Sequence, residues 1–200
     1  AAYYDNVEAH ARMYEEACAP HPNPITTFLE KLQSFGQTGW YLGGGARVAS
    51  FDGRPMICGM VRIMDPSIEG GDKLEHSPHI DSVPHASIIR QFSGNIYLKV
   101  PPGREGALRL WSTRNVRKGV TITAAWLEQK RVEEPHRTAT QILEHYGAVE
   151  LPPIVPEVGD LVLIPTYQPH SVDRVRSDDR MSLQTFIGYT GDNNPLLLWN

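Results

Sequence analysis

The sequence has few cysteines, no excess of basic residues and no long apolar stretch. Cys18 and Cys58 are its 2 cysteines, too few and too far apart for a disulfide scaffold or a zinc ribbon, so we expect two buried thiols. The net charge is -4 and the 19 Lys and Arg residues are scattered, which disfavours nucleic acid as a partner. Because neither a signal-peptide pattern nor an apolar run of about 18 residues is present, we expect a cytoplasmic protein without a membrane partner.

The composition is that of an ordinary globular chain, with 40% hydrophobic and 21% charged residues among 200. A chain of this length predicts a single domain over residues 1–200. Apolar residues recur at helical spacing over residues 5–19, and a second helix is predicted from Thr26 or Thr27 to the glycine at position 36. We therefore expect a helical segment at 1–39 that supports a core at 40–200.

The periodicity changes after residue 39, where short β-branched and aromatic runs alternate with Gly, Pro, Asn and Asp. This pattern is typical of an all-β sandwich or jelly roll. One further helix is predicted at 137–146, where Gly147 provides a stop signal. The predicted strands are 47–51, 56–64, 88–100, 107–112, 120–126, 160–164, 171–175 and 181–189. The predicted fold class is mainly β.

Three residues within the β-rich region form a candidate metal site. His79 and Asp81 are two positions apart, so on a strand both side chains point to one face. His170 follows the predicted strand 160–164 and can supply a third ligand. Two imidazoles and one carboxylate form the facial triad of non-haem Fe(II) oxygenases, which leaves positions open for other ligands. Alone, the His-x-Asp pair arises often by chance and then marks only polar surface residues.

Arg180 and Ser182 strengthen the metal hypothesis because they also share one strand face. A guanidinium and a hydroxyl side by side can hold a carboxylate through parallel N–H bonds and one O–H bond. A dicarboxylate cosubstrate needs such a binding site. The alternative for Arg180 is a surface ion pair with Asp173, Asp178 or Asp179.

Together these motifs resemble the 2-oxoglutarate/Fe(II)-dependent oxygenases, whose pattern is His-x-Asp, a distal His and then Arg-x-Ser. The resemblance covers residues 76–189 and implies a double-stranded β-helix, which is a distorted jelly roll, with Fe(II) and 2-oxoglutarate as cofactors. It further implies O2 and a small-molecule substrate as partners. The segments 95–100 and 106–111 look like the small-molecule branch that includes hydroxylases and halogenases. Since Asp81 is intact, the resemblance favours a hydroxylase over a halogenase.

Several further residues are candidates for cofactor or substrate contacts. By resemblance, Asn95 and Tyr97 would bind the keto-acid end of 2-oxoglutarate, and a structural hydrogen bond is the alternative for each. Arg109 is a candidate for a substrate carboxylate, because an unpaired buried arginine is costly. Trp111 is expected in the core or in the substrate wall, and His85 either at the substrate or in ordinary loop packing.

Two rival functions fit the same fold class. A cupin-type metalloenzyme that does not use 2-oxoglutarate would leave the Arg-x-Ser motif unexplained. A non-catalytic jelly-roll binding module would not need all three metal ligands. Within the oxygenase hypothesis we expect an amino acid or a natural-product intermediate as substrate, with a protein side chain as the runner-up.

Overall fold

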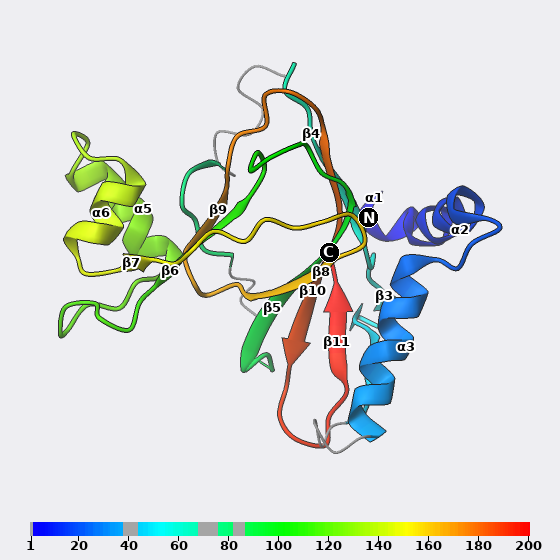
Figure 1. Cartoon of the computed structure of the whole chain (residues 1–200). Coiled ribbons are helices and arrows are strands. Elements are labelled where there is room, and N and C mark those ends of the chain that lie inside the picture. Colours follow the sequence, from blue (N-terminus) through cyan, green and yellow to red (C-terminus); the bar gives the residue numbers. More distant parts are fainter. Residues whose placement is uncertain (1, 38–43, 68–75, 82–86) are drawn as a thin grey trace. The chain divides into compact units, whose positions relative to one another are not determined.

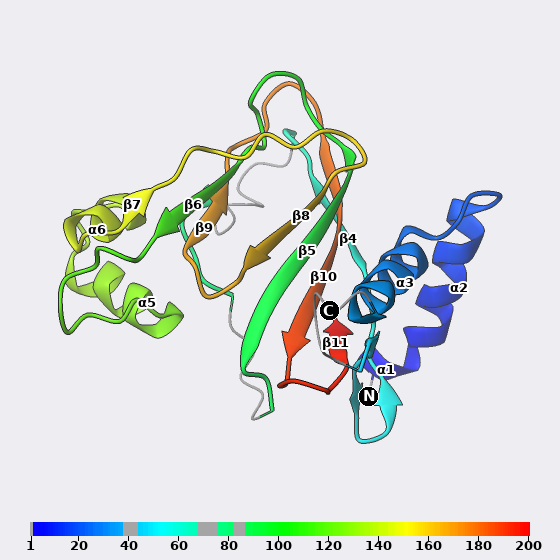
Figure 2. The same ribbon diagram turned by 60° about the horizontal axis from the view of Figure 1, so that its bottom comes forward.

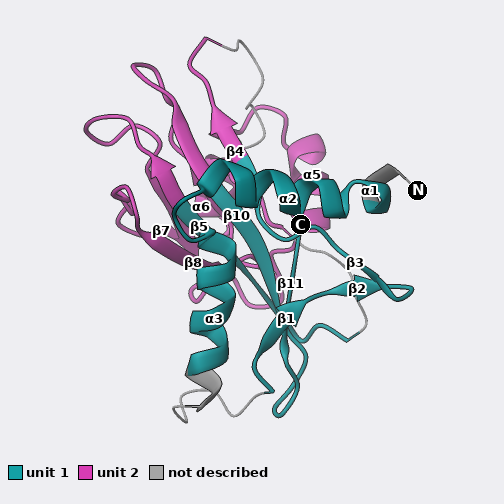
Figure 3. Cartoon of the chain, turned by 90° about the vertical axis from the view of Figure 1, so that its right-hand side faces the viewer, with its two compact units in different colours: residues 1–61, 84–96, 183–200 teal, residues 62–83, 97–182 magenta. Residues whose placement is uncertain are grey.

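The computed structural model describes residues 2–37, 44–67, 76–81 and 87–200. The chain divides into two compact units, one made of residues 1–61, 84–96 and 183–200 and the other of residues 62–83 and 97–182 (Figure 3). Two long strands, β5 (Arg90–Lys99) and β10 (Arg180–Tyr189), contribute residues to both units.

The helices of the first unit confirm the two predicted near the N-terminus. They are α1 (Ala2–Asp5), α2 (Val7–Cys18) and α3 (Pro24–Gln37). The third begins before the predicted threonines because Pro24 suits a first helical turn, where its missing N–H costs nothing. The Asn23 side chain accepts a hydrogen bond from the Ile25 backbone N–H (2.9 Å) at this helix start.

In the sheet of the first unit, the last strand of the chain lies between two other strands. Strand β11 (Leu196–Trp199) pairs in parallel with β1 (Ala46–Val48) and antiparallel with β10. Helix α3 packs against this sheet through a buried cluster formed by Phe28, Leu32, Ala46, Ile187 and Leu198 (Figures 1 and 2). A separate hairpin joins β2 (Ser50–Phe51) and β3 (Arg54–Pro55). Strand β11 was not predicted, because its short apolar run lacks the alternation of a half-buried strand.

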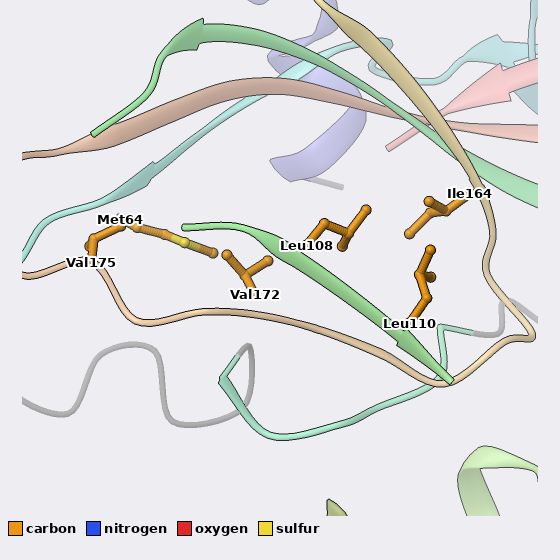
Figure 4. Close-up of a cluster of buried hydrophobic side chains, with 6 residues drawn as sticks. All are labelled: Met64, Leu108, Leu110, Ile164, Val172 and Val175. Carbon is orange, nitrogen blue, oxygen red and sulfur yellow. The ribbon is translucent and has the colours of Figure 1, made fainter. Parts of the chain in front are cut away.

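The second unit contains a three-stranded antiparallel sheet in the order β7-β6-β9. Its strands are β6 (Leu108–Ser112), β7 (Val149–Glu150) and β9 (His170–Val172). Strand β8 (Leu161–Pro165) follows Asp160, whose carbonyl accepts a hydrogen bond from the Tyr97 N–H (3.0 Å). One apolar core cluster of this unit is shown in Figure 4 and consists of Met64, Leu108, Leu110, Ile164, Val172 and Val175.

Helices α5 (Ala124–Glu133) and α6 (Ala139–His145) lie between β6 and β7 in the chain (Figure 1). The predicted helix at 137–146 is confirmed, and it begins with a capping box formed by Thr138 and Gln141. The predicted strand at 120–126 is wrong. The Thr123 side chain accepts a hydrogen bond from the Trp126 N–H (3.1 Å), so this threonine caps a helix where its β-branched neighbours favoured a strand.

Other predicted strands are shorter than expected, among them 56–64 and 171–175. Of the predicted strand 56–64, only β4 (Met60–Met64) forms, because Gly59 adopts φ +82°, in the left-handed region that favours glycine. The protein is thus a mixture of helices and sheets. None of the helices in the described part of the chain is long and apolar enough to cross a membrane.

Candidate metal centre

The structure brings His79, Asp81 and His170 together within the second unit. One ligand atom from each lies within 4.8 Å of the others. The Nε2 atom of His170 is 3.5 Å from Asp81 Oδ2, and the Nε2 atom of His79 is 4.0 Å from Asp81 Oδ1. Since neighbouring ligands of an ion bound at about 2.1 Å are about 3 Å apart, small side-chain movements suffice to coordinate one metal ion.

Backbone pairing places the two histidines opposite each other. The N–H of each residue donates to the carbonyl of the other, at 2.9 Å in both directions, as an isolated antiparallel bridge between His79 and His170. The Asp81 N–H donates to the carbonyl of Thr166 (3.2 Å), which directly follows β8 in the connection to β9. These backbone hydrogen bonds therefore hold the segment with His79 and Asp81 against the segment that carries His170.

Both imidazoles are oriented by backbone carbonyls. The Nδ1 atom of His79 lies 2.9 Å from the Ser77 carbonyl oxygen, and that of His170 lies 2.9 Å from the Gln168 carbonyl oxygen. A carbonyl can only accept, so the proton of each neutral ring is on Nδ1 and the lone pair is on Nε2. The Nε2 atoms face Asp81, which is the arrangement that metal-binding histidines need.

The electrostatic environment favours the metal-binding forms of the site. Burial lowers the pKa of His79, and the charges of His170 and Arg62 lower it further. Burial alone would raise the pKa of Asp81, but its neighbours His170, His79 and Arg62 outweigh burial, so the pKa is lowered. A neutral imidazole and an ionised carboxylate are therefore both favoured at neutral pH.

Arg62 was not identified from the sequence. It lies on β4 two residues before Met64, so both side chains point to the same face of the strand. Met64 is 2% exposed in the core of the second unit, and Arg62 is half-buried. In the sequence, the alternation of side chains along this strand could have placed Arg62 on the same face as Met64.

Arg180 is a buried guanidinium, 4% exposed. Its Nη2 donates to the Tyr97 hydroxyl (3.1 Å), its Nη1 lies 3.6 Å from the Met64 sulfur, and its Cζ is 4.8 Å from the centre of the Tyr97 ring. Among the residues described, no carboxylate pairs with it, and its Nε lacks a partner.

The surface ion pairs considered for Arg180 are formed by other residues. Lys99 Nζ lies 2.7 Å from Asp178 and 3.5 Å from Asp179. Asp173 faces Arg109 at 3.8 Å.

Ser182 lies two residues from Arg180 on the same face of β10. It is 1% exposed, and its Oγ has no partner in the described parts of the chain. A buried cation and an unsatisfied hydroxyl side by side are costly unless an anion completes them. These donors have the chemistry to bind a carboxylate, and that role for Arg180 and Ser182 stays a prediction.

Two other predicted residues lie on the far face of the β6–β9 pair. Leu110 is paired with His170, so Arg109 and Trp111 point to the opposite side. Arg109 donates to both carboxylate oxygens of Glu150 (2.7 and 2.6 Å). Trp111 is fully buried against α5 and α6. A contact of Arg109 with substrate would require it to leave Glu150.

Of the two remaining residues predicted to contact cofactor or substrate, Asn95 and His85, the structure describes only Asn95. Asn95 belongs to the first unit, where its Nδ2 donates to Ser93 Oγ (3.1 Å), which also accepts from Gln184 Nε2 (3.0 Å). Its role in cofactor binding stays a prediction. His85 lies outside the described residues.

The fold resembles that of a solved dioxygenase, and the three predicted ligands come together in this chain, which confirms the resemblance predicted from the motifs. The fold is similar to two crystal structures of an N-substituted L-amino acid dioxygenase from Burkholderia ambifaria AMMD, both with a TM-score of 0.57 and 17% sequence identity. The first match covers 78% of this chain and 58% of that one, and the second, a complex with alpha-KG (2-oxoglutarate), covers 98% and 72%. No protein-family model and no curated protein matches the sequence.

Proposed function

We propose that this protein is an Fe(II)- and 2-oxoglutarate-dependent oxygenase that hydroxylates an unactivated C–H bond of an amino-acid-like small molecule. One observation carries the proposal. A three-ligand centre with open positions occurs in the same unit as Arg180, a buried cation without a carboxylate partner among the described residues. The first feature suits iron and the second suits the dicarboxylate that iron oxygenases consume.

Each residue then has a defined task. His79, Asp81 and His170 would hold Fe(II) on one face. Arg180 and Ser182 would bind the remote carboxylate of 2-oxoglutarate. Bound together, Fe(II) and 2-oxoglutarate would supply the electrons that activate O2 for attack on a C–H bond, while 2-oxoglutarate is oxidised to succinate and CO2. The protein orients the ligands and excludes water from the site.

Tyr97 has a supporting role in this proposal. Its ring stacks on the Arg180 guanidinium, and its hydroxyl accepts a hydrogen bond from it. Both contacts hold the guanidinium plane while leaving Nε free to donate to an anion. The sequence had suggested a direct contact between Tyr97 and the cosubstrate.

The proposed fold is a double-stranded β-helix over residues 40–200 with helical support from 1–39, in one domain. The antiparallel β7-β6-β9 sheet and the long strands β5 and β10 support it, as does the similarity to a dioxygenase fold. In this arrangement the metal ligands would lie at one mouth of the roll.

The proposal of an amino-acid-like substrate rests on the positive charge of Arg62 and on the similarity in fold to a known dioxygenase. The fold resembles that of a dioxygenase of N-substituted L-amino acids, and Arg62 places a positive charge near His79 and Asp81. A substrate carboxylate would be attracted to that charge. Hydroxylation is proposed over halogenation, because the Asp81 carboxylate occupies the coordination position that a halide would need.

A cupin-type metalloenzyme is the second candidate. It accounts for the triad, but a buried Arg180 beside an unsatisfied Ser182 hydroxyl would then have no purpose. A non-catalytic binding module explains neither feature.

The first experiment adds Fe(II) and 2-oxoglutarate to the purified protein without oxygen and records the weak visible charge-transfer absorption of the iron-bound keto acid. We expect the band in the natural protein, its loss in His79→Ala and its weakening in Arg180→Ala. Arg104→Ala, which changes an exposed arginine, serves as the matched control. Iron binding without the band would favour a cupin-type enzyme, and no iron binding would favour the binding module.

A further inference from the structure

The segment that carries His79 and Asp81 has little regular structure of its own. Within residues 77–81 the single bridge at His79 is the only strand-type assignment, and residue 76 is helical. A metal ligand on such a segment depends on a few specific contacts for its direction. The bridge to His170 and the Asp81 N–H bond attach the segment on the side of β9.

A second attachment comes from helix α5. The Arg131 Nη2 atom donates to the Pro78 carbonyl oxygen (2.6 Å) and to Ser77 Oγ (2.9 Å). The Arg131 side chain is 22% exposed and also pairs with Glu128 one turn earlier in the helix. This arginine thus reaches across 53 residues of sequence to the two residues immediately before His79.

The two acceptors, the Pro78 carbonyl oxygen and the Ser77 hydroxyl, belong to the two residues that orient His79. The Pro78 carbonyl belongs to the peptide unit that joins Pro78 to His79, so a bond to it restrains the plane of that peptide. The Ser77 carbonyl accepts from His79 Nδ1 (2.9 Å) and thereby sets the tautomer. A charged guanidinium forms stronger bonds than a neutral donor would, and its single Nη2 atom donates to both residues.

We propose that Arg131 is a positioning residue for the metal centre, which ties helix α5 to the ligand-bearing segment and holds His79 Nε2 toward the metal. The inference rests on the proposed metal-binding function. Arg131 touches neither the metal ligands nor the Arg180 site directly, and it acts through Ser77 and Pro78.

The test is anaerobic titration of the metal-free protein with Fe(II) alone, and with Co(II) as a spectroscopic probe, without cosubstrate or substrate. We expect Arg131→Ala to weaken metal binding about 10- to 100-fold, the range found when groups that orient metal ligands are removed. Arg131→Lys, which keeps the charge but not the planar donor, should recover part of the affinity. The Co(II) visible spectrum should also change, because His79 is less well oriented.

Lys130→Ala is the matched control, because this neighbour in α5 forms a similar ion pair one turn away, with Glu133, and has no contact with Ser77 or Pro78. Its metal affinity should equal that of the natural protein. If the natural protein binds no metal, the proposed function fails. If it binds metal and Arg131→Ala binds as tightly, the positioning role is overturned. Should Arg131→Ala not fold, Arg131→Lys decides: natural affinity overturns the role and intermediate affinity supports it.

Discussion

At the scale of single residues, Arg180 combines a stability cost with a proposed binding role. A buried charge without a counter-charge among the described residues destabilises the cosubstrate-free protein. Arg180→Met, which replaces it with an apolar side chain of similar length, should leave the free energy of unfolding unchanged or raise it. The same variant should lose the stabilisation that 2-oxoglutarate provides. Urea unfolding with and without 2-oxoglutarate checks both, and a clear loss of stability in the free protein would contradict the first expectation.

Gly106 is packed against Arg180 and has φ +69°. A Cβ atom at this position would lie 2.7 Å from Arg180 Cδ. Gly106→Ala should therefore cost about 1–3 kcal/mol of stability from backbone strain and also weaken 2-oxoglutarate binding. Gly103→Ala is a matched control, because Gly103 has φ +74° but no atom within 4 Å of its added Cβ. Equal 2-oxoglutarate affinities for the two variants would show that the contact with Arg180 is irrelevant.

The pKa of His79 predicts how stability depends on pH. Because burial and neighbouring charges lower this pKa from 6.5, the unfolded chain takes up the proton at a higher pH than the folded protein. The metal-free protein should thus lose stability as pH falls below about 6.5, and the lowered pKa of Asp81 acts in the same direction at lower pH. His79→Gln should show a shallower loss, measured by urea unfolding between neutral and mildly acidic pH. An unchanged slope would contradict this account.

At the scale of elements, helix α5 joins the apolar core of its unit to the metal centre. Leu127 is 1% exposed and packs with Trp111 and with α6. Leu127→Ala should cost about 2–5 kcal/mol and should lower metal affinity too, since the same helix carries Arg131. Val132→Ala, at a position 81% exposed in this helix, should change neither property. Calorimetric unfolding and metal titration separate the two effects, and natural metal affinity in a destabilised Leu127→Ala would contradict the coupling.

The errors of the sequence analysis also lie at the scale of elements. The run from Val120 to Thr123 is β-branched and favoured a strand, but Thr123 is followed by helix-forming residues and caps α5. Strand β11 is a short apolar run that local pattern could not distinguish from other buried segments. The structure of each of these two segments depends on the residues against which it packs. Those residues are distant in the sequence, so local pattern could not reveal them.

At the scale of the whole molecule, local sequence determined the type of most elements and the chemistry of the site. Along β10 a spacing of two residues was sufficient to place Arg180 and Ser182 on one face, because alternation is a property of the extended backbone itself. His79 and Asp81 lie instead on a segment with a single bridge. The chemical character of imidazole, carboxylate and guanidinium then restricted the ligands that such pairs can bind.

Only the tertiary structure decided which residues meet across long stretches of chain. It paired His170 with His79, placed Arg131 on the peptide before His79, and gave Arg109 a carboxylate partner in Glu150. It also left Arg180 buried without such a partner in the part of the chain that it describes. These contacts depend on strand pairing and on the packing of α5, which are non-local. The residue pattern therefore predicted which ligands the site could bind, and only the fold determined which residues meet there.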